Sequence, residues 1–295
     1  MKKLIPILHC IVILLCGCQS QPDPEAVNFD DKPALPIEEV SELPYLTAVK
    51  DGVSPANPIE IETELGKIVG KQMDGEQSDY TLISFEDPET GETYPLCARA
   101  NCTHDSFDCP AYQMFLTGMH YDGEYLYIIG EELNENRVDD VLIRQKLDGS
   151  DRKIVCRLTD TSEGGTAAVL GSVFQDGMVY YKVFGSVFDE ETKTLNTKEQ
   201  IWIAELSTGK VRPIPINFNN GGNGSTLNFH GMYGKELILS RYTDEVGKQR
   251  DTDYRILYFL LNVETYEITV ILDVMDMEGG GKLGWSYLPE YGLLW

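Results

Sequence analysis

The stretch Asp122-Gly123-Glu124-Tyr125-Leu126-Tyr127 shows the pattern that decides the fold. It is a tight polar turn followed by a strand in which aromatic and aliphatic residues alternate. Related turns carry Gly66, Gly177 and Gly234, so that the four glycines lie 57, 54 and 57 residues apart along the chain. A spacing this regular indicates an internal repeat.

A second series of turns keeps the same period. Its turn residues are Thr90, Ser150, Thr208 and Thr265, which lie 60, 58 and 57 residues apart. Each repeat therefore offers two hairpins and four short strands rich in Tyr, Val and Ile. Four strands per unit at this length are typical of a β-propeller blade. We expect four-stranded units near residues 57–97, 114–158, 168–215 and 228–273, arranged around one axis.

The end of the sequence resembles part of another unit. The stretch Leu283-Gly284-Trp285 repeats the turn and strand, and the sequence stops at Trp295. Because an open ring leaves sheet edges and blade faces unpaired, we interpret the chain as an incomplete protein. The predicted fold class is all-β, a propeller of four four-stranded blades plus part of a fifth. The alternative is a closed ring of four blades with a short tail.

The first residues have the features of an export signal. Met1-Lys2-Lys3 is basic, residues 4–15 are apolar, and Leu15-Cys16-Gly17-Cys18 follows. The apolar run is shorter than the ~18 residues that cross a bilayer, so we expect a signal peptide at residues 1–17. Lipidation of Cys18 would then attach the protein to the cell membrane, facing outside the cytoplasm. The alternative is an ordinary signal peptide with Cys18 as a plain thiol.

The mature chain is expected to have a tether and one folded domain. Residues 18–44 contain five prolines and many acids, a composition typical of a flexible acidic tether. Residues 45–295 would form the propeller domain. The chain has 48 acidic against 24 basic residues and a net charge of −24, which argues against nucleic acid as a partner.

Four potential ligands occur between the first and second units. Cys97, Cys102, His104 and Cys109 have the spacing Cys-x4-Cys-x-His-x4-Cys, and thiolate with imidazole is a ligand set that suits zinc. Export also allows disulfides among Cys97, Cys102, Cys109 and Cys156, and the sequence favours these over a metal site. Either role is structural, since no nucleophile and base accompany the cluster. We expect it on the propeller face that carries the crossovers between blades.

The same segment carries a resemblance. The pattern Pro-x-Cys-x4-Cys-x-His-x4-Cys-x-Ala-Tyr begins at Pro95 and ends at Tyr112, downstream of the Leu-x-Gly-Cys motif. It resembles uncharacterised β-propeller lipoproteins of anaerobic Firmicutes, similar to DUF5050 and TolB-like propellers. The resemblance implies a fold and a location, and it implies no activity.

No catalytic motif accompanies these features. The sequence contains no P-loop, no G-x-S-x-G and no H-E-x-x-H, so we assign no catalytic residue. The predicted function is a surface-tethered extracytoplasmic binding or scaffold module, with an extracellular protein or glycan as its ligand. The alternative is a glycan-active or peptidase-associated propeller enzyme whose catalytic residues lie in missing blades.

Overall fold

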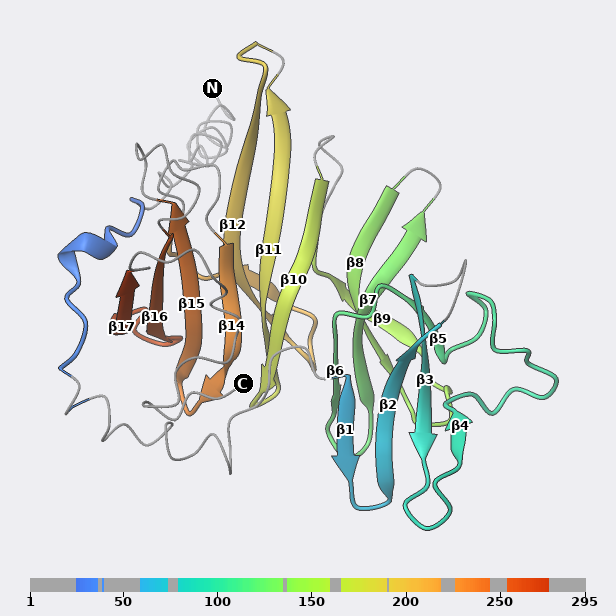
Figure 1. Ribbon diagram of the computed structural model, residues 1–295. Coiled ribbons are helices and arrows are strands. Elements are labelled where there is room, and N and C mark those ends of the chain that lie inside the picture. The colour runs from blue at the N-terminus through green and yellow to red at the C-terminus, as the bar shows by residue number, and fades with distance from the viewer. Residues whose placement is uncertain are drawn as a thin grey trace, which may run out of the picture.

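The computed structural model describes residues 25–36, 39, 59–73, 79–134, 137–159, 166–189, 191–218, 226–244 and 254–275. Seventeen β-strands and the short 3-10 helix η2 (Phe29–Asp31) make up their regular structure (Figure 1). Cys18 and the unit expected from Leu283 lie outside the described residues. None of the described helical segments is long and apolar enough to cross a membrane.

The strands form four antiparallel sheets in chain order, which we call blades 1 to 4. Blade 1 contains β1 (Glu60–Thr63), β2 (Gly66–Gln72), β3 (Tyr80–Glu86), β4 (Thr93–Pro95) and β5 (Tyr112–Met114). Blade 2 contains β6 (Gly118–Tyr121), β7 (Leu126–Asn134), β8 (Arg137–Gln145) and β9 (Lys153–Arg157). Blade 3 contains β10 (Thr166–Gln175), β11 (Met178–Asp189), β12 (Thr194–Glu205) and β13 (Val211–Pro213). Blade 4 contains β14 (Thr226–Tyr233), β15 (Glu236–Asp244), β16 (Tyr254–Asn262) and β17 (Ile268–Met275).

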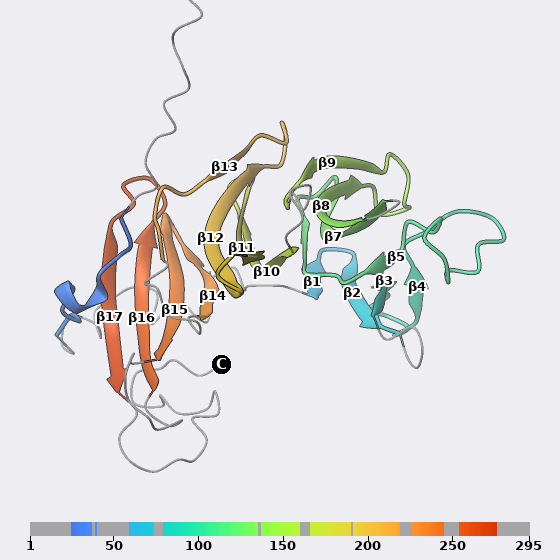
Figure 2. The ribbon, with the colours of Figure 1, turned by 90° about the horizontal axis from the view of Figure 1, so that it is seen from above.

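The predicted β-propeller plan is confirmed for the described residues. The first strand of each blade contacts the first strand of the next, β1 with β6, β6 with β10 and β10 with β14. The view in Figure 2 shows these strands on the inside of an open arc, with β9, β13 and β17 toward the outside. The first turn series joins strands one and two of every blade, and the second joins strands three and four.

Blades 2 and 3 are buried on both faces. Along β7, Leu126 and Ile128 pack toward blade 1, while Tyr127 and Ile129 pack toward blade 3. Successive strand residues point to opposite faces, so a strand that packs between two neighbouring sheets is rich in apolar residues on both faces. Tyr180 and Tyr181 divide in the same way between blades 4 and 2. The strand aromatics therefore form the packing between blades.

The outer hairpins also contact the preceding blade. In blade 2, the Asp148 carbonyl accepts a hydrogen bond of 2.9 Å from the Ala98 amide of the loop that leaves blade 1. In blade 4, the Tyr266 hydroxyl accepts one of 3.0 Å from Arg212 of blade 3. These turns tie neighbouring blades together at the outside of the arc.

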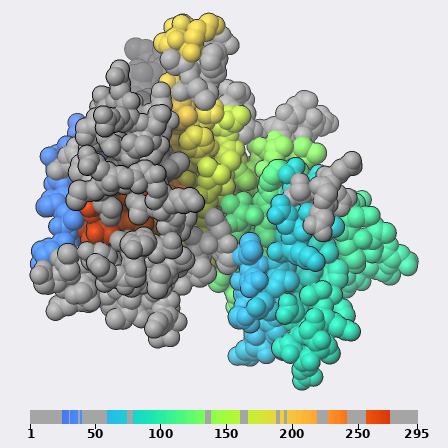
Figure 3. Space-filling model, in the orientation of Figure 1, coloured from blue at the N-terminus to red at the C-terminus, as the bar shows by residue number. Residues whose placement is uncertain are grey.

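Part of the predicted tether packs on the propeller. The Val27 amide donates to the Asn217 carbonyl at 2.8 Å, and the Leu35 amide donates to the Val270 carbonyl of β17 at 3.0 Å. The ring of Phe29 is 6% exposed and lies 5.1 Å from the ring of Phe259. This segment therefore lies against blade 4, far from the first blade (Figure 3). Residues 25–36 belong to the folded unit rather than to a free tether.

Candidate metal centre and adjoining cleft

The cysteine loop, which we define as residues 96–111, interrupts the outer edge of blade 1. β4 pairs with Ser84–Glu86 of β3, and β5 pairs with Tyr80–Leu82 of the same strand. The loop leaves this edge after β4 and returns to it at β5 (Figure 1). The expected position on a crossover face is wrong, because the chain crosses to β6 only after β5. The fifth strand that causes this was not predicted.

The loop brings four potential ligand atoms together. The ligand atoms of Cys97, Cys102, His104 and Cys109 all lie within 4.8 Å of one another. His104 Nδ1 lies 3.3 Å from Cys109 Sγ. Bond lengths of 2.3 Å to sulfur and 2.0–2.1 Å to nitrogen place tetrahedral zinc ligands roughly 3.4–3.8 Å apart. Small shifts of these side chains would therefore bring the four atoms to tetrahedral spacing.

Tight turns position these side chains. The Cys102 amide donates to the Arg99 carbonyl at 3.4 Å, and the Cys109 amide donates to the Ser106 carbonyl at 2.9 Å. Asn101 and His104 adopt left-handed conformations, with φ of 62° and 58°. Residues other than glycine occupy this region rarely, and such residues are common at ligand-binding sites. The backbone thus directs separate parts of the loop toward one point.

Two arginines lie beside the cluster. Arg99 donates to the Asp108 carbonyl, and Arg152 of blade 2 donates to the Pro110 carbonyl at 3.0 Å, so the two cations flank Cys109. Burial raises the pKa of Cys109 to about 12. A hydrogen bond from the His104 backbone lowers the pKa of Cys102, and the positive charge of Arg99 lowers it further.

Cys156 does not join the cluster. It lies on β9 opposite Leu142 and packs with Tyr181 in the core between blades 2 and 3. The other three cysteines pack in the core between blades 1 and 2. All four have free thiols in the structure, and burial raises the pKa of Cys156 to about 11. The sheet of blade 2 therefore separates Cys156 from the other three.

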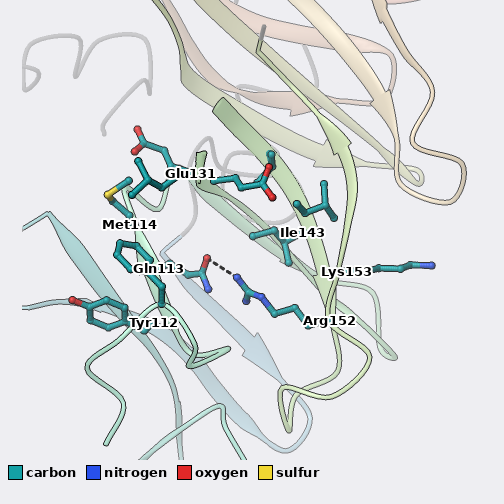
Figure 4. A pocket seen from close by; sticks show the side chains of 12 residues that line it. Tyr112, Gln113, Met114, Glu131, Ile143, Arg152 and Lys153 are labelled. Carbon is teal, nitrogen blue, oxygen red and sulfur yellow. Dashed lines mark hydrogen bonds between the residues drawn. The ribbon is translucent and has the colours of Figure 1, made fainter. Parts of the chain in front are cut away.

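A cleft of about 490 Å³ lies beside the cysteine loop. It is lined by Phe107 of that loop, by β5 of blade 1 and by β7, β8 and β9 of blade 2 (Figure 4). This volume falls in the range typical of pockets for small ligands. Nothing in the sequence marked this cleft, because its walls come from segments that are distant along the chain.

Arg152 joins the two sides of the cleft. Its Nη1 donates to Gln145 Oε1 at 2.7 Å and to the Pro110 carbonyl at 3.0 Å. Its Nη2 donates to Gln113 Oε1 of β5 at 3.3 Å, which is the bond drawn in Figure 4. Burial lowers the pKa of Arg152. Its bonded acceptors are neutral, so the guanidinium contributes positive charge to the cleft.

The cleft also contains acidic and exposed apolar residues. Burial, together with Asp140 and Asp79, raises the pKa of Glu131 to about 7, while Glu132 forms an ion pair of 2.5 Å with Arg157. Three lining side chains are large, apolar and exposed, namely Phe107 (54%), Leu133 (61%) and Ile154 (41%). Among the described residues that line the cleft there is no Ser, Thr, Cys or His.

Comparisons with known proteins assign no family. No protein-family model matches the chain, and no curated protein matches it. Among solved structures, the chain is similar to the β-propeller domain of Nup133 from Vanderwaltozyma polyspora, with 12% sequence identity and a TM-score of 0.27. The similarity covers 75% of this chain and 63% of that domain, so the chain spans less than two thirds of the propeller it matches.

Proposed function

We propose that this protein is a lipid-anchored extracytoplasmic binding module, and that the cleft between blades 1 and 2 binds an extended peptide segment of an extracellular protein. The observation that carries the proposal is the cleft of about 490 Å³ that two blades and the cysteine loop enclose. Ligand pockets are concave and often lie between packed units.

The chemistry of the cleft supports a peptide. Exposed apolar side chains grouped at a cavity favour contact with apolar side chains of a partner. Leu133 and Ile154 are aliphatic and suit the apolar side chains of a peptide, while the exposed ring of Phe107 could pack against a peptide side chain or a sugar. Ile154 lies on β9, the outermost strand of blade 2, and outermost strands present backbone N–H and C=O groups to an added strand.

The anchor is supported by sequence alone. Leu15-Cys16-Gly17-Cys18 after a short apolar run favours acylation of Cys18. A cell that exports the chain should incorporate labelled fatty acid into the wild type and none into a Cys18→Ala variant. Label that persists in the variant would remove the lipoprotein part of the proposal and leave the binding part unaffected.

The peptide proposal is tested by selection from a random peptide library with the full chain. Peptides enriched by the wild type should lose affinity for Leu133→Ser and Ile154→Ser, each by roughly 10-fold or more, since burying one such side chain is worth ~1.5–3 kcal/mol. The matched control is Val187→Ser on β11, which removes an aliphatic side chain of similar exposure, 54%, from a surface outside the cleft.

Three outcomes would overturn the peptide proposal. One is a selection that yields no enriched peptide while a glycan array yields a ligand. Another is enriched peptides whose affinity falls as much with Val187→Ser as with Leu133→Ser. Binding as tight as that of the wild type in all three variants would also place the binding surface elsewhere on the molecule.

A glycan-active enzyme is the second candidate, and Glu131 is the observation that favours it. A carboxyl group in a cleft with a pKa of about 7 can act as a general acid near neutral pH. If the cleft hydrolyses glycans, Glu131→Gln should abolish the activity, and Glu132→Gln should weaken it by loosening the contact with Arg157. Glycan hydrolysis that survives Glu131→Gln would exclude this site.

A further inference from the structure

We propose that Cys97, Cys102, His104 and Cys109 bind one zinc ion, and that this ion fastens blade 1 to blade 2. The proposal is independent of which ligand the cleft binds. It starts from the four ligand atoms that lie within 4.8 Å of one another in one loop. Three sulfurs and one imidazole nitrogen form a common closed zinc site.

The binding step balances without any oxidant. Zn²⁺ binds three thiols, which release three protons to solvent as four metal–ligand bonds form, and the imidazole binds as the neutral ring. The resulting centre has a net charge of −1. Arg99 and Arg152, which bond the carbonyls on either side of Cys109, supply positive charge next to it. Four protein ligands leave no open position, so the ion is structural.

The placement of Cys156 favours metal over disulfides. An even number of cysteines would allow complete pairing, but Cys156 packs on the opposite side of the blade 2 sheet. Two of the remaining three could pair only by leaving one thiol and His104 without a role. A single zinc ion uses all four groups at once.

The contacts of the loop show what the ion would hold together. Cys97 follows β4, and Cys109 precedes β5, so both ends of the loop belong to blade 1. Within the loop, the Ala98 amide donates a hydrogen bond to the Asp148 carbonyl of blade 2, and the Pro110 carbonyl accepts one from Arg152 of blade 2. A metal that rigidifies the loop therefore also rigidifies the junction between the two blades.

The test is to measure zinc in the full chain, isolated from the membranes of a cell that exports it. We expect about one zinc ion per chain, as a closed four-ligand site requires. The His104→Ala and Cys109→Ser variants should lose the ion, while His104→Cys, which restores four ligands, should keep it. The matched control is Cys156→Ser, which should retain zinc at the wild-type level.

A second measurement needs no variant. The wild-type chain is unfolded in denaturant that contains a chelator and no reductant, and its free thiols are alkylated. The modified cysteines are then identified by peptide mass spectrometry. Alkylation of Cys97, Cys102 and Cys109 together is the expected result. A disulfide between any two of them, a zinc content well below one per chain, or loss of zinc in Cys156→Ser would each overturn the proposal.

Discussion

The outer turns of blades 2 and 3 allow a sharp test of how neighbouring blades pack. Gly149 and Gly209 occupy equivalent turns, with φ of 78° and 70°. A Cβ added to Gly149 would lie 2.4 Å from Cγ of Pro110, and one added to Gly209 would lie 2.4 Å from the Val155 carbonyl oxygen. Gly91 has the same place in blade 1 and a φ of 69°, and a Cβ there would meet nothing within 4 Å.

The three alanine variants should therefore differ in stability. In each variant, placing alanine in the left-handed region costs roughly 1–2 kcal/mol of stability. Gly149→Ala and Gly209→Ala should lose a further ~1–3 kcal/mol, because the methyl group must push the preceding blade away by about 1 Å or more. Gly209→Ala should be the more severe, since its clash is with the backbone of β9 rather than with a loop proline.

The assay is equilibrium unfolding in urea, followed by tryptophan fluorescence and checked by thermal unfolding. In a domain of this size, 1 kcal/mol corresponds to a Tm shift of about 2–4 °C, so Gly209→Ala should melt clearly below Gly91→Ala. Equal losses of stability in all three variants, within about 0.5 kcal/mol, would refute the inference that these turns press on the preceding blade.

Three further predictions concern buried or partly buried side chains. Phe29→Ala should lower the free energy of unfolding by about 3 kcal/mol, because its ring packs on Phe259, and no change would mean that the segment is a free tether. Glu131 has its pKa raised to about 7, so its stabilising effect is present below pH ~4 and lost as the pH rises through 7. Denaturant titrations should give Glu131→Gln the same free energy of unfolding as the wild type at pH 4. At pH 8 the variant should be more stable by about 1 kcal/mol, a value reduced for solvent screening. The same difference at both pH values would contradict this. His230 is buried against Ser240 with its pKa lowered to about 4, so its contribution is present above pH ~6.5 and lost as the pH falls through 4. Relative to His230→Gln, the wild type should lose about 3 kcal/mol between pH 7 and pH 4, and parallel titration curves would show that His230 does not titrate in this way.

The turns and the blade plan follow from local chemistry. A tight turn between two strands needs residues that accept positive φ. The strands of a blade that lies between two others are apolar on both faces. Both requirements therefore recur in the sequence once per blade. Gly123 and Gly177 could therefore be placed between strands one and two of their blades from the sequence pattern. The spacing of Cys97, Cys102, His104 and Cys109 is local in the same sense.

Other features depend on contacts between distant segments. β5 pairs with the half of β3 that β4 does not reach, and this pairing places the cysteine loop at the outer edge of blade 1. Composition alone also did not reveal that Phe29 packs on blade 4. An alternating strand shows that its side chains divide between two faces, but it does not show which face meets which neighbour.

The sequence by itself determined that the chain folds into repeated four-stranded units and that four zinc-type ligands occur within one short segment. Only the tertiary structure decided that Cys156 lies across a sheet from the other cysteines, and that Arg152 and Glu131 line a cleft with β5. The physical reason is that turn conformation and ligand spacing are encoded in neighbouring residues, whereas a cleft and a cross-blade separation exist only after long-range packing brings distant strands together.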